Sequence, residues 1–213
     1  MLTVREYLAR EMMPSLGCTE PVAVALAAAR ASRELHKSPI DLIEVDISDS
    51  IYKNGMGVGV PGANGRTGNG LAAALGAIAG KSELDMQVLR DVGEDDVERA
   101  LQLLSEGRLK LTCLEEVHGV YILVKVKSAG HTAECRIEGE HNNIVSVKID
   151  GTELVKKGVK EASGKTEEDP FLGIPYEDLL KLADQLTAED VDAITAGIEM
   201  NRDIARYGLE GGP

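Results

Sequence analysis

Four short segments follow one another closely in the second half of the chain, and they restrict its possible folds most; two of them are rich in valine and isoleucine. Segments of this length and composition, separated by Gly, Asn or Asp, are typical of β-strands. The gaps between them are too short for the crossover connection that parallel neighbours require. The sequence therefore predicts an antiparallel meander. Its strands are expected over residues 109–114, 120–127, 131–138 and 144–149.

Helical patterns surround this predicted meander. The stretch VAVALAAARA, within an expected helix over residues 20–36, is apolar nearly all round and predicts a buried helix. Residues 41–48 alternate apolar and polar side chains, which indicates one further strand. Helices and strands are thus segregated along the chain, so we predict an α+β fold in which helices pack with a small, mostly antiparallel sheet. The other helices are expected over residues 3–13, 71–81, 94–106, 176–185 and 188–207.

Changes of composition along the chain suggest four regions. Residues 1–107 form a helical region that holds a glycine-rich loop and one strand, and residues 108–156 form the antiparallel strand meander. Residues 157–175 are interpreted as a linker, because residues 157–169 are mostly polar or charged. Residues 176–213 hold the C-terminal helices.

The charge balance argues against nucleic acid and anionic lipid as partners. The chain has 23 Lys and Arg against 36 Asp and Glu, a net charge of −13, so its surface repels phosphate groups. Only 3% of the residues are aromatic, which argues against base stacking. The three cysteines show no paired spacing, and no segment has the pattern of a secretion signal or a membrane span. We therefore expect a cytoplasmic protein with neither nucleic-acid nor membrane partners.

Residues 51–70, IYKNGMGVGVPGANGRTGNG, form an unusual segment with seven glycines in its last sixteen residues. It contains the pattern G-x-G-x-x-G, but no helix starts there and no βαβ unit surrounds it, so dinucleotide binding is not indicated. Glycines permit positive φ angles and a close approach of the backbone to a ligand. Together with Ser50, Lys53 and Asn54, bare backbone N–H groups suit a small carboxylate. The alternative is a long mobile loop or tight backbone packing.

Cys18 stands just before the expected helix over residues 20–36, in the motif GCTEP. A helix N-terminus lowers the pKa of a thiol and favours the thiolate, which is the form that binds metals or attacks an electrophile. The alternative is a cysteine that serves as a small apolar side chain. Cys113 and Cys135 lie within predicted strands among apolar neighbours, where this second role is favoured.

His141 is followed by two asparagines in the segment GEHNN, between two predicted strands. Such a segment commonly forms a polar hairpin turn. The functional alternative is a loop that presents an imidazole and two amides to a ligand. Taken alone, these residues favour the turn.

Three of these segments, in this order, resemble the N-terminal part of the L-cysteine desulfidase family. They are GCTEP with the alanine-rich helix behind it, IYKNGMGVGVPG at residues 51–62 and GEHNNIV at residues 139–145. This family is related to the α chain of the iron–sulfur L-serine dehydratases. The resemblance implies β-elimination on a small amino acid, either L-cysteine to sulfide, ammonia and pyruvate, or L-serine to ammonia and pyruvate. It also implies a [4Fe–4S] cluster held by three cysteines, whose open iron acts as a Lewis acid.

The motifs of this resemblance carry residues with implied roles. Cys18 matches the N-terminal cysteine ligand of the cluster, and Lys53 and His141 are the implied catalytic residues and candidates for the general base. The implied substrate-binding residues are Thr19, Glu20, Ser50, Asn54, Gly55, Gly57 and Asn142.

The other two cluster cysteines of the family lie in a C-terminal region, and Cys113 and Cys135 do not match them. The resemblance therefore implies an N-terminal portion that is inactive alone and binds no cluster by itself, with the [4Fe–4S] cluster present in the complete enzyme. The implied partners are a small amino-acid substrate and a C-terminal domain or second subunit, and a homo-oligomer is also open. The alternative function is a non-catalytic subunit that binds an amino acid or carboxylate, or that regulates another protein.

Overall fold

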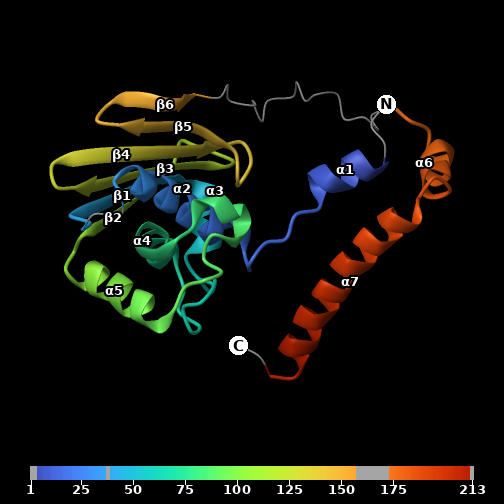
Figure 1. The fold of residues 1–213 in the computed structure, drawn as a ribbon, viewed down its shortest axis with the longest axis horizontal. Coiled ribbons are helices and arrows are strands. Elements are labelled where there is room, and N and C mark those ends of the chain that lie inside the picture. The colour runs from blue at the N-terminus through green and yellow to red at the C-terminus, as the bar shows by residue number, and fades with distance from the viewer. Residues whose placement is uncertain (1–3, 37–38, 157–172, 212–213) are drawn as a thin grey trace. The chain divides into compact units, whose positions relative to one another are not determined.

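A computed structural model describes residues 4–36, 39–156 and 173–211 (Figure 1). The chain forms two compact units, which we call the core unit and the helical unit. The core unit is formed by residues 14–162, and the helical unit combines residues 1–13 with residues 163–213. Most of the predicted linker over residues 157–175 lies outside the described residues.

The described part of the core unit contains one six-stranded sheet with the strand order β2-β1-β3-β4-β5-β6. β1 pairs in parallel with β2, and all other neighbouring strands pair antiparallel. This mostly antiparallel sheet and its helices confirm the predicted α+β class. The strands are β1 (Leu42–Ser48), β2 (Leu109–Leu114), β3 (Tyr121–Ser128), β4 (His131–Glu138), β5 (Ile144–Ile149) and β6 (Thr152–Lys156).

Three of the core-unit helices lie where the sequence predicts them, within a few residues. Two further helical segments, α3 and η1, were not predicted. α3 covers the start of the glycine-rich segment, so Lys53 and Asn54 lie on a helix rather than in a loop. The core-unit helices are α2 (Thr19–Glu34), α3 (Asp49–Gly55), α4 (Asn69–Ala79), the 3₁₀ helix η1 (Ser82–Gln87) and α5 (Glu94–Ser105).

The predicted meander is confirmed from β3 to β5, and it continues into β6, which the sequence did not predict. The placement of β2 in that meander is wrong, because β2 pairs with β1 and not with β3. The chain between β1 and β2 contains α4 and α5, and is long enough for the crossover that a parallel pair requires. β1 lies between β2 and β3, so the predicted division at residue 107 runs through a single sheet.

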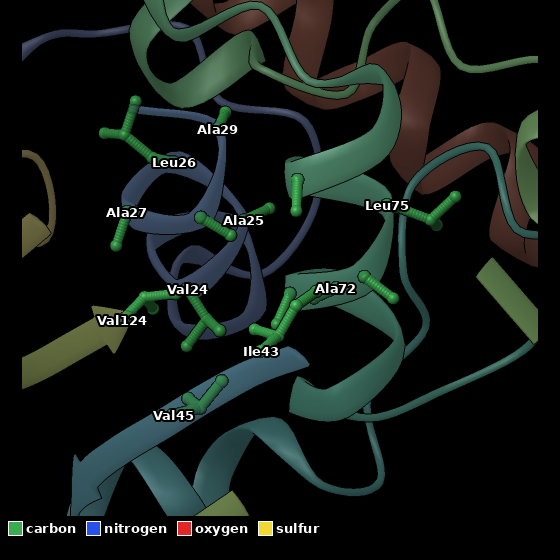
Figure 2. Close-up of a cluster of buried hydrophobic side chains, with 14 of the residues drawn as sticks. Val24, Ala25, Leu26, Ala27, Ala29, Ile43, Val45, Ala72, Leu75 and Val124 are labelled. Carbon is green, nitrogen blue, oxygen red and sulfur yellow. The ribbon is translucent and has the colours of Figure 1, made fainter. Parts of the chain in front are cut away.

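α2 lies at the centre of the core unit, and every residue from Pro21 to Ala29 is buried. The helix contacts α4 as well as β3 and β4. Figure 2 shows α2 beside α4, with Val24 close to Ile43 and Val45 of β1. The apolar circumference of α2 is thus covered within the core unit, and this confirms the prediction of a buried helix.

Small residues bring α2 and α4 unusually close together. A Cβ atom added at Gly76 would lie 2.2 Å from the carbonyl oxygen of Ala25, and one at Gly80 would lie 2.8 Å from the Cβ of Ala29. Residues four apart share one face of a helix, so a pair of alanines on α2 faces Gly76 of α4 and Gly80, which is the C-cap of that helix. The two backbones approach each other directly because side chains are minimal at these four positions.

The helical unit contains α1 (Val4–Glu11), α6 (Tyr176–Ala183) and α7 (Ala188–Leu209). Thr187 caps α7: its Oγ1 accepts a hydrogen bond from the Asp190 backbone N–H, and its own N–H donates to the Asp190 carboxylate. Arg5 of α1 donates to the same carboxylate, with 3.2 Å between Nε and Oδ1. Among the described residues, no helix combines the length and the apolar composition that crossing a membrane requires.

Candidate functional site

The Glu20 carboxylate joins two of the three motifs singled out in the sequence. Cys18 is the N-cap of α2, and Glu20 lies in the first turn of that helix. One carboxylate oxygen, Oε2, accepts from the Cys18 Sγ at 2.7 Å and from the Thr19 Oγ1 at 3.3 Å. The other, Oε1, accepts from the Asn54 Nδ2 at 3.1 Å. Asn54 belongs to α3, so this hydrogen bond holds the glycine-rich segment against the start of α2.

The third motif reaches the same carboxylate through His141. Burial raises the pKa of Glu20. Hydrogen bonds from Cys18 and Asn54, together with the charge of His141, lower the pKa by more than burial raises it, so the pKa lies below its ordinary value. His141 thus influences Glu20 through its charge, whereas the hydrogen bonds of the carboxylate among the described residues come from Cys18, Thr19 and Asn54. We call Cys18, Thr19, Glu20, Asn54 and His141 the Glu20 cluster.

The structure corrects one expectation about Cys18. Its position at a helix N-terminus predicted a lowered thiol pKa, whereas the pKa of Cys18 is raised. Partial burial is the main cause, and the neighbouring Glu20 carboxylate, which accepts the S–H hydrogen bond, adds to it. A negative charge beside a sulfur disfavours the thiolate, and this outweighs the effect of the helix end. Cys18 and Glu20 therefore form a thiol–carboxylate pair in which the protonated thiol donates a hydrogen bond to the ionised carboxylate.

This pairing predicts the reactivity of the thiol. The substitution Glu20→Gln removes the negative charge, so the pKa of Cys18 falls and more thiolate is present at any pH below that pKa. Because each pKa unit changes the thiolate fraction tenfold in this range, we expect alkylation of Cys18 by iodoacetamide at mildly alkaline pH to become about three- to tenfold faster. Quantification of alkylated peptides by mass spectrometry measures this rate.

Cys135 provides the internal control for this measurement. It is fully buried in β4, and burial raises the pKa of its thiol to about 12, so it should remain unreactive in both proteins. An unchanged or slower reaction of Cys18 in the Glu20→Gln variant would show that the carboxylate does not control the thiol.

Asp85 joins the site although no sequence pattern pointed to it. Asn142, the residue after His141, donates from Nδ2 to the Asp85 Oδ2 at 3.1 Å. Asp85 lies in η1 with φ +52° and ψ −126°, a backbone conformation that residues other than glycine rarely adopt. Its other oxygen, Oδ1, is buried and has no hydrogen-bond partner among the described residues. Strained backbone of this kind concentrates at functional sites, so Asp85 extends the candidate site beyond the three motifs.

Lys53 and Gly57 lie at the exposed side of α3 and of the glycine-rich segment. Lys53 directly precedes Asn54, and within the described residues its side chain forms neither a hydrogen bond nor an ion pair. A Cβ atom at Gly57 would meet no atom within 4 Å, so the space beside it is open. Both positions are therefore accessible to a ligand bound next to the Glu20 cluster.

Two other predicted site residues have structural roles. The Ser50 hydroxyl donates to the Gly119 carbonyl at 2.6 Å, which fastens α3 to the loop between β2 and β3. A Cβ atom at Gly55 would lie only 2.1 Å from the Asn69 Oδ1, so this glycine permits the close packing of α3 on α4. The structure thus brings neither residue into hydrogen-bonding contact with Glu20.

The sulfur ligands of an iron–sulfur cluster are incomplete in this chain. Cys113 lies in β2 and Cys135 in β4, each on a strand of the sheet rather than in the Glu20 cluster. Within the described residues, no three His, Cys, Asp or Glu side chains gather as a metal-binding group. A [4Fe–4S] cluster with three cysteine ligands therefore does not fit this chain by itself, and Cys18 offers one thiol to such a group.

Comparison with known proteins identifies relatives that are about twice as long. The chain is 41% identical over 217 residues to a UPF0597 protein of Kosmotoga olearia, a match that covers 100% of the chain and 50% of that protein. It is 36% identical over 219 residues to a UPF0597 protein of Desulfatibacillum aliphaticivorans, a match that covers 99% of the chain and 50% of that protein. The chain spans about half the length of the curated relatives it matches. No family model matches the sequence, and no solved structure does.

Proposed function

We propose that this chain is the N-terminal portion of an iron–sulfur-dependent lyase that performs β-elimination on a small amino acid. The substrate is L-cysteine, which yields sulfide, ammonia and pyruvate, or L-serine, which yields ammonia and pyruvate. The observation that supports this proposal best is the meeting of three motifs at Glu20. GCTEP, the Lys53–Asn54 pair and GEHNN lie far apart in the sequence, yet each contributes a group in or next to one half-buried carboxylate.

Each part of an amino-acid substrate has a matching group at this place. The lowered pKa keeps Glu20 ionised, so its carboxylate suits the α-ammonium group. The exposed ammonium of Lys53 suits the α-carboxylate. We assign removal of the α-proton to His141. The electron pair of the broken C–H bond then forms the Cα–Cβ double bond, the thiol or hydroxyl group leaves, and the enamine hydrolyses to pyruvate and ammonia.

Cys18 is assigned to the cluster in this proposal. A [4Fe–4S] cluster completed by cysteines outside this chain would supply a Lewis-acidic iron when bound. Ligation to a metal requires the thiolate, and the Cys18 thiol donates its hydrogen bond to Glu20. When Cys18 binds the cluster, the thiol proton is released to solvent, and the Glu20 carboxylate stays ionised.

The test uses a complete protein that contains this chain. The chain is joined to the part of the Kosmotoga olearia relative that lies outside the match, and the fusion is loaded anaerobically with iron and sulfide. Pyruvate release from L-cysteine or L-serine would support the proposal. A fusion that carries its cluster and turns over neither amino acid would contradict it, and amino-acid binding by calorimetry without turnover would favour the non-catalytic binding subunit.

Substitution of Lys53 tests the assigned binding of the carboxylate. In the active fusion, Lys53→Ala is expected to lower kcat/KM about tenfold, mainly through a higher KM, because an exposed charge pair to the substrate is lost in the ground state and the transition state alike. Lys110→Ala, at an exposed position of β2, changes the net charge equally and should leave both constants unchanged. A loss confined to kcat would instead place Lys53 in the chemical step.

A further inference from the structure

α7 has an apolar surface that its own unit leaves largely uncovered. Asp190 is the one buried residue among its 22 residues. Two rows of apolar side chains run along the helix at spacings of three and four, so each row occupies one face. The first apolar stripe consists of Val191, Ile194 and Ile198, and the second apolar stripe consists of Met200, Ile204 and Tyr207.

These stripes are strongly exposed. Ile198 is 53% exposed, Ile204 65% and Tyr207 64%. All but three of the large apolar side chains that are exposed in the described residues belong to the helical unit. Single exposed apolar residues are ordinary on a protein surface, whereas a contiguous set marks a binding surface.

Met12 contacts α7 within the helical unit, and a groove lies beside this contact and the first apolar stripe. Met12 follows α1, and its terminal methyl carbon would lie 3.0 Å from a Cβ atom at Gly197. Between Met12 and α7 is a groove of about 550 Å³, whose lining includes Ile194, Ile198 and Ala205. The groove is large enough to take side chains from another polypeptide.

Charged residues occupy a separate face of α7. Asp192, Glu199 and Asp203 follow one another at spacings of seven and four, so they lie on one side of the helix. Arg202 borders the first apolar stripe and the groove and pairs with Glu199 of this acidic row. Exposed apolar rows on both sides of a charged row are typical of a helix that packs inside a bundle. We therefore expect helices other than α1 to cover the apolar faces of α7.

The relatives indicate where those helices come from, because the chain covers 50% of the Kosmotoga olearia protein and leaves the other half unmatched. We propose that the two apolar stripes of α7 are the docking surface for the polypeptide that corresponds to this unmatched half. That polypeptide is expected to present an apolar helix face that fills the groove beside Met12. The inference rests on the same division into two halves as the proposed function, but it does not require lyase chemistry.

The test therefore measures binding in the absence of cluster and substrate. The full chain is mixed with the unmatched half of the Kosmotoga olearia relative, produced as a separate polypeptide, and the complex is followed by sedimentation and calorimetry. We expect a one-to-one complex that Ile198→Lys and Ile204→Lys each weaken about tenfold or more. Ile198→Leu should retain binding, and Asp192→Asn, which changes the charge by the same amount on the charged face, should leave it unchanged.

Three results would overturn this inference. The first is that the two polypeptides do not bind. The second is that the chain self-associates through the stripes, which would make a second copy the occupant. The third is that Ile198→Lys lowers the melting temperature of the chain alone, which would mean that the chain covers the stripe itself. A complex that forms as expected in a protein without lyase activity would refute the proposed function and leave the docking surface standing.

Discussion

Replacement of Gly76 by alanine is expected to destabilise the core unit by about 2 kcal/mol, although alanine is the better helix former. The added Cβ would lie 2.2 Å from the Ala25 carbonyl oxygen and 2.7 Å from the Ala25 Cα, and both atoms belong to the backbone of α2. No side-chain rotation relieves such a contact, so the two helices must move apart. Overpacking of a well-packed core typically costs about 1–3 kcal/mol. The gain of alanine over glycine within a helix, about 1 kcal/mol, is smaller.

The same helix offers a matched control for this prediction. A Cβ atom at Gly70 would lie 3.4 Å from a methyl carbon of Leu109, which is an ordinary contact. Gly70→Ala is therefore expected to be neutral or slightly stabilising. Urea unfolding followed by far-ultraviolet circular dichroism compares the two variants. If both retain the midpoint of the unmodified protein, α2 and α4 do not contact each other through their backbones.

The elements that the sequence predicts well are those with local causes. The apolar circumference of α2 requires burial, and the alternation in β3 and β4 requires a half-buried sheet, whatever the rest of the chain does. Thr187 and Asp190 are three residues apart, so their capping box follows from local spacing. The burial of α2 and the strands β3 and β4 were predicted, and all three are present in the structure.

The missed elements depend on contacts that no local pattern records. β2 is as short as the other strands and comes shortly before β3 in sequence, and its parallel pairing with β1 becomes apparent only when α4 and α5 are placed between β1 and β2. α3 carries a glycine and an asparagine at its end, which disfavour a helix by propensity alone. Packing against the sheet and α2 outweighs that propensity.

The candidate site likewise combines features that the sequence predicts with features that depend on tertiary contacts. The three motifs came from resemblance, and their meeting at Glu20 is a tertiary contact that residue spacing did not predict. The lowered thiol pKa expected for Cys18 was argued from the helix end alone, and partial burial together with the Glu20 carboxylate two residues later reverses it. Asp85 was missed because neither its positive φ nor its bond to Asn142 leaves a trace in the sequence.

Replacement of Cys18 by serine is expected to abolish lyase activity in the cluster-loaded fusion, with a loss on the order of 100-fold or more. Substitution of a residue that supports a metal ligand typically lowers metal affinity or activity about 10–100-fold. Loss of a proposed ligand should therefore lower activity at least as much. Serine retains a hydroxyl that can donate to Glu20, so the unfolding midpoint of the apo protein should change little. Iron content and visible absorbance of the cluster, measured together with pyruvate release, report the effect.

Cys113→Ser serves as the control for this substitution, because Cys113 is a half-buried thiol on β2 and not part of the Glu20 cluster. It should leave iron content and turnover unchanged. A Cys18→Ser fusion that keeps its iron but loses turnover would place Cys18 in the chemistry rather than in the cluster. A fusion that keeps both would remove Cys18 from the site. The thiol–carboxylate pair would then serve only to fasten the start of α2, a role that its 2.7 Å hydrogen bond also supports.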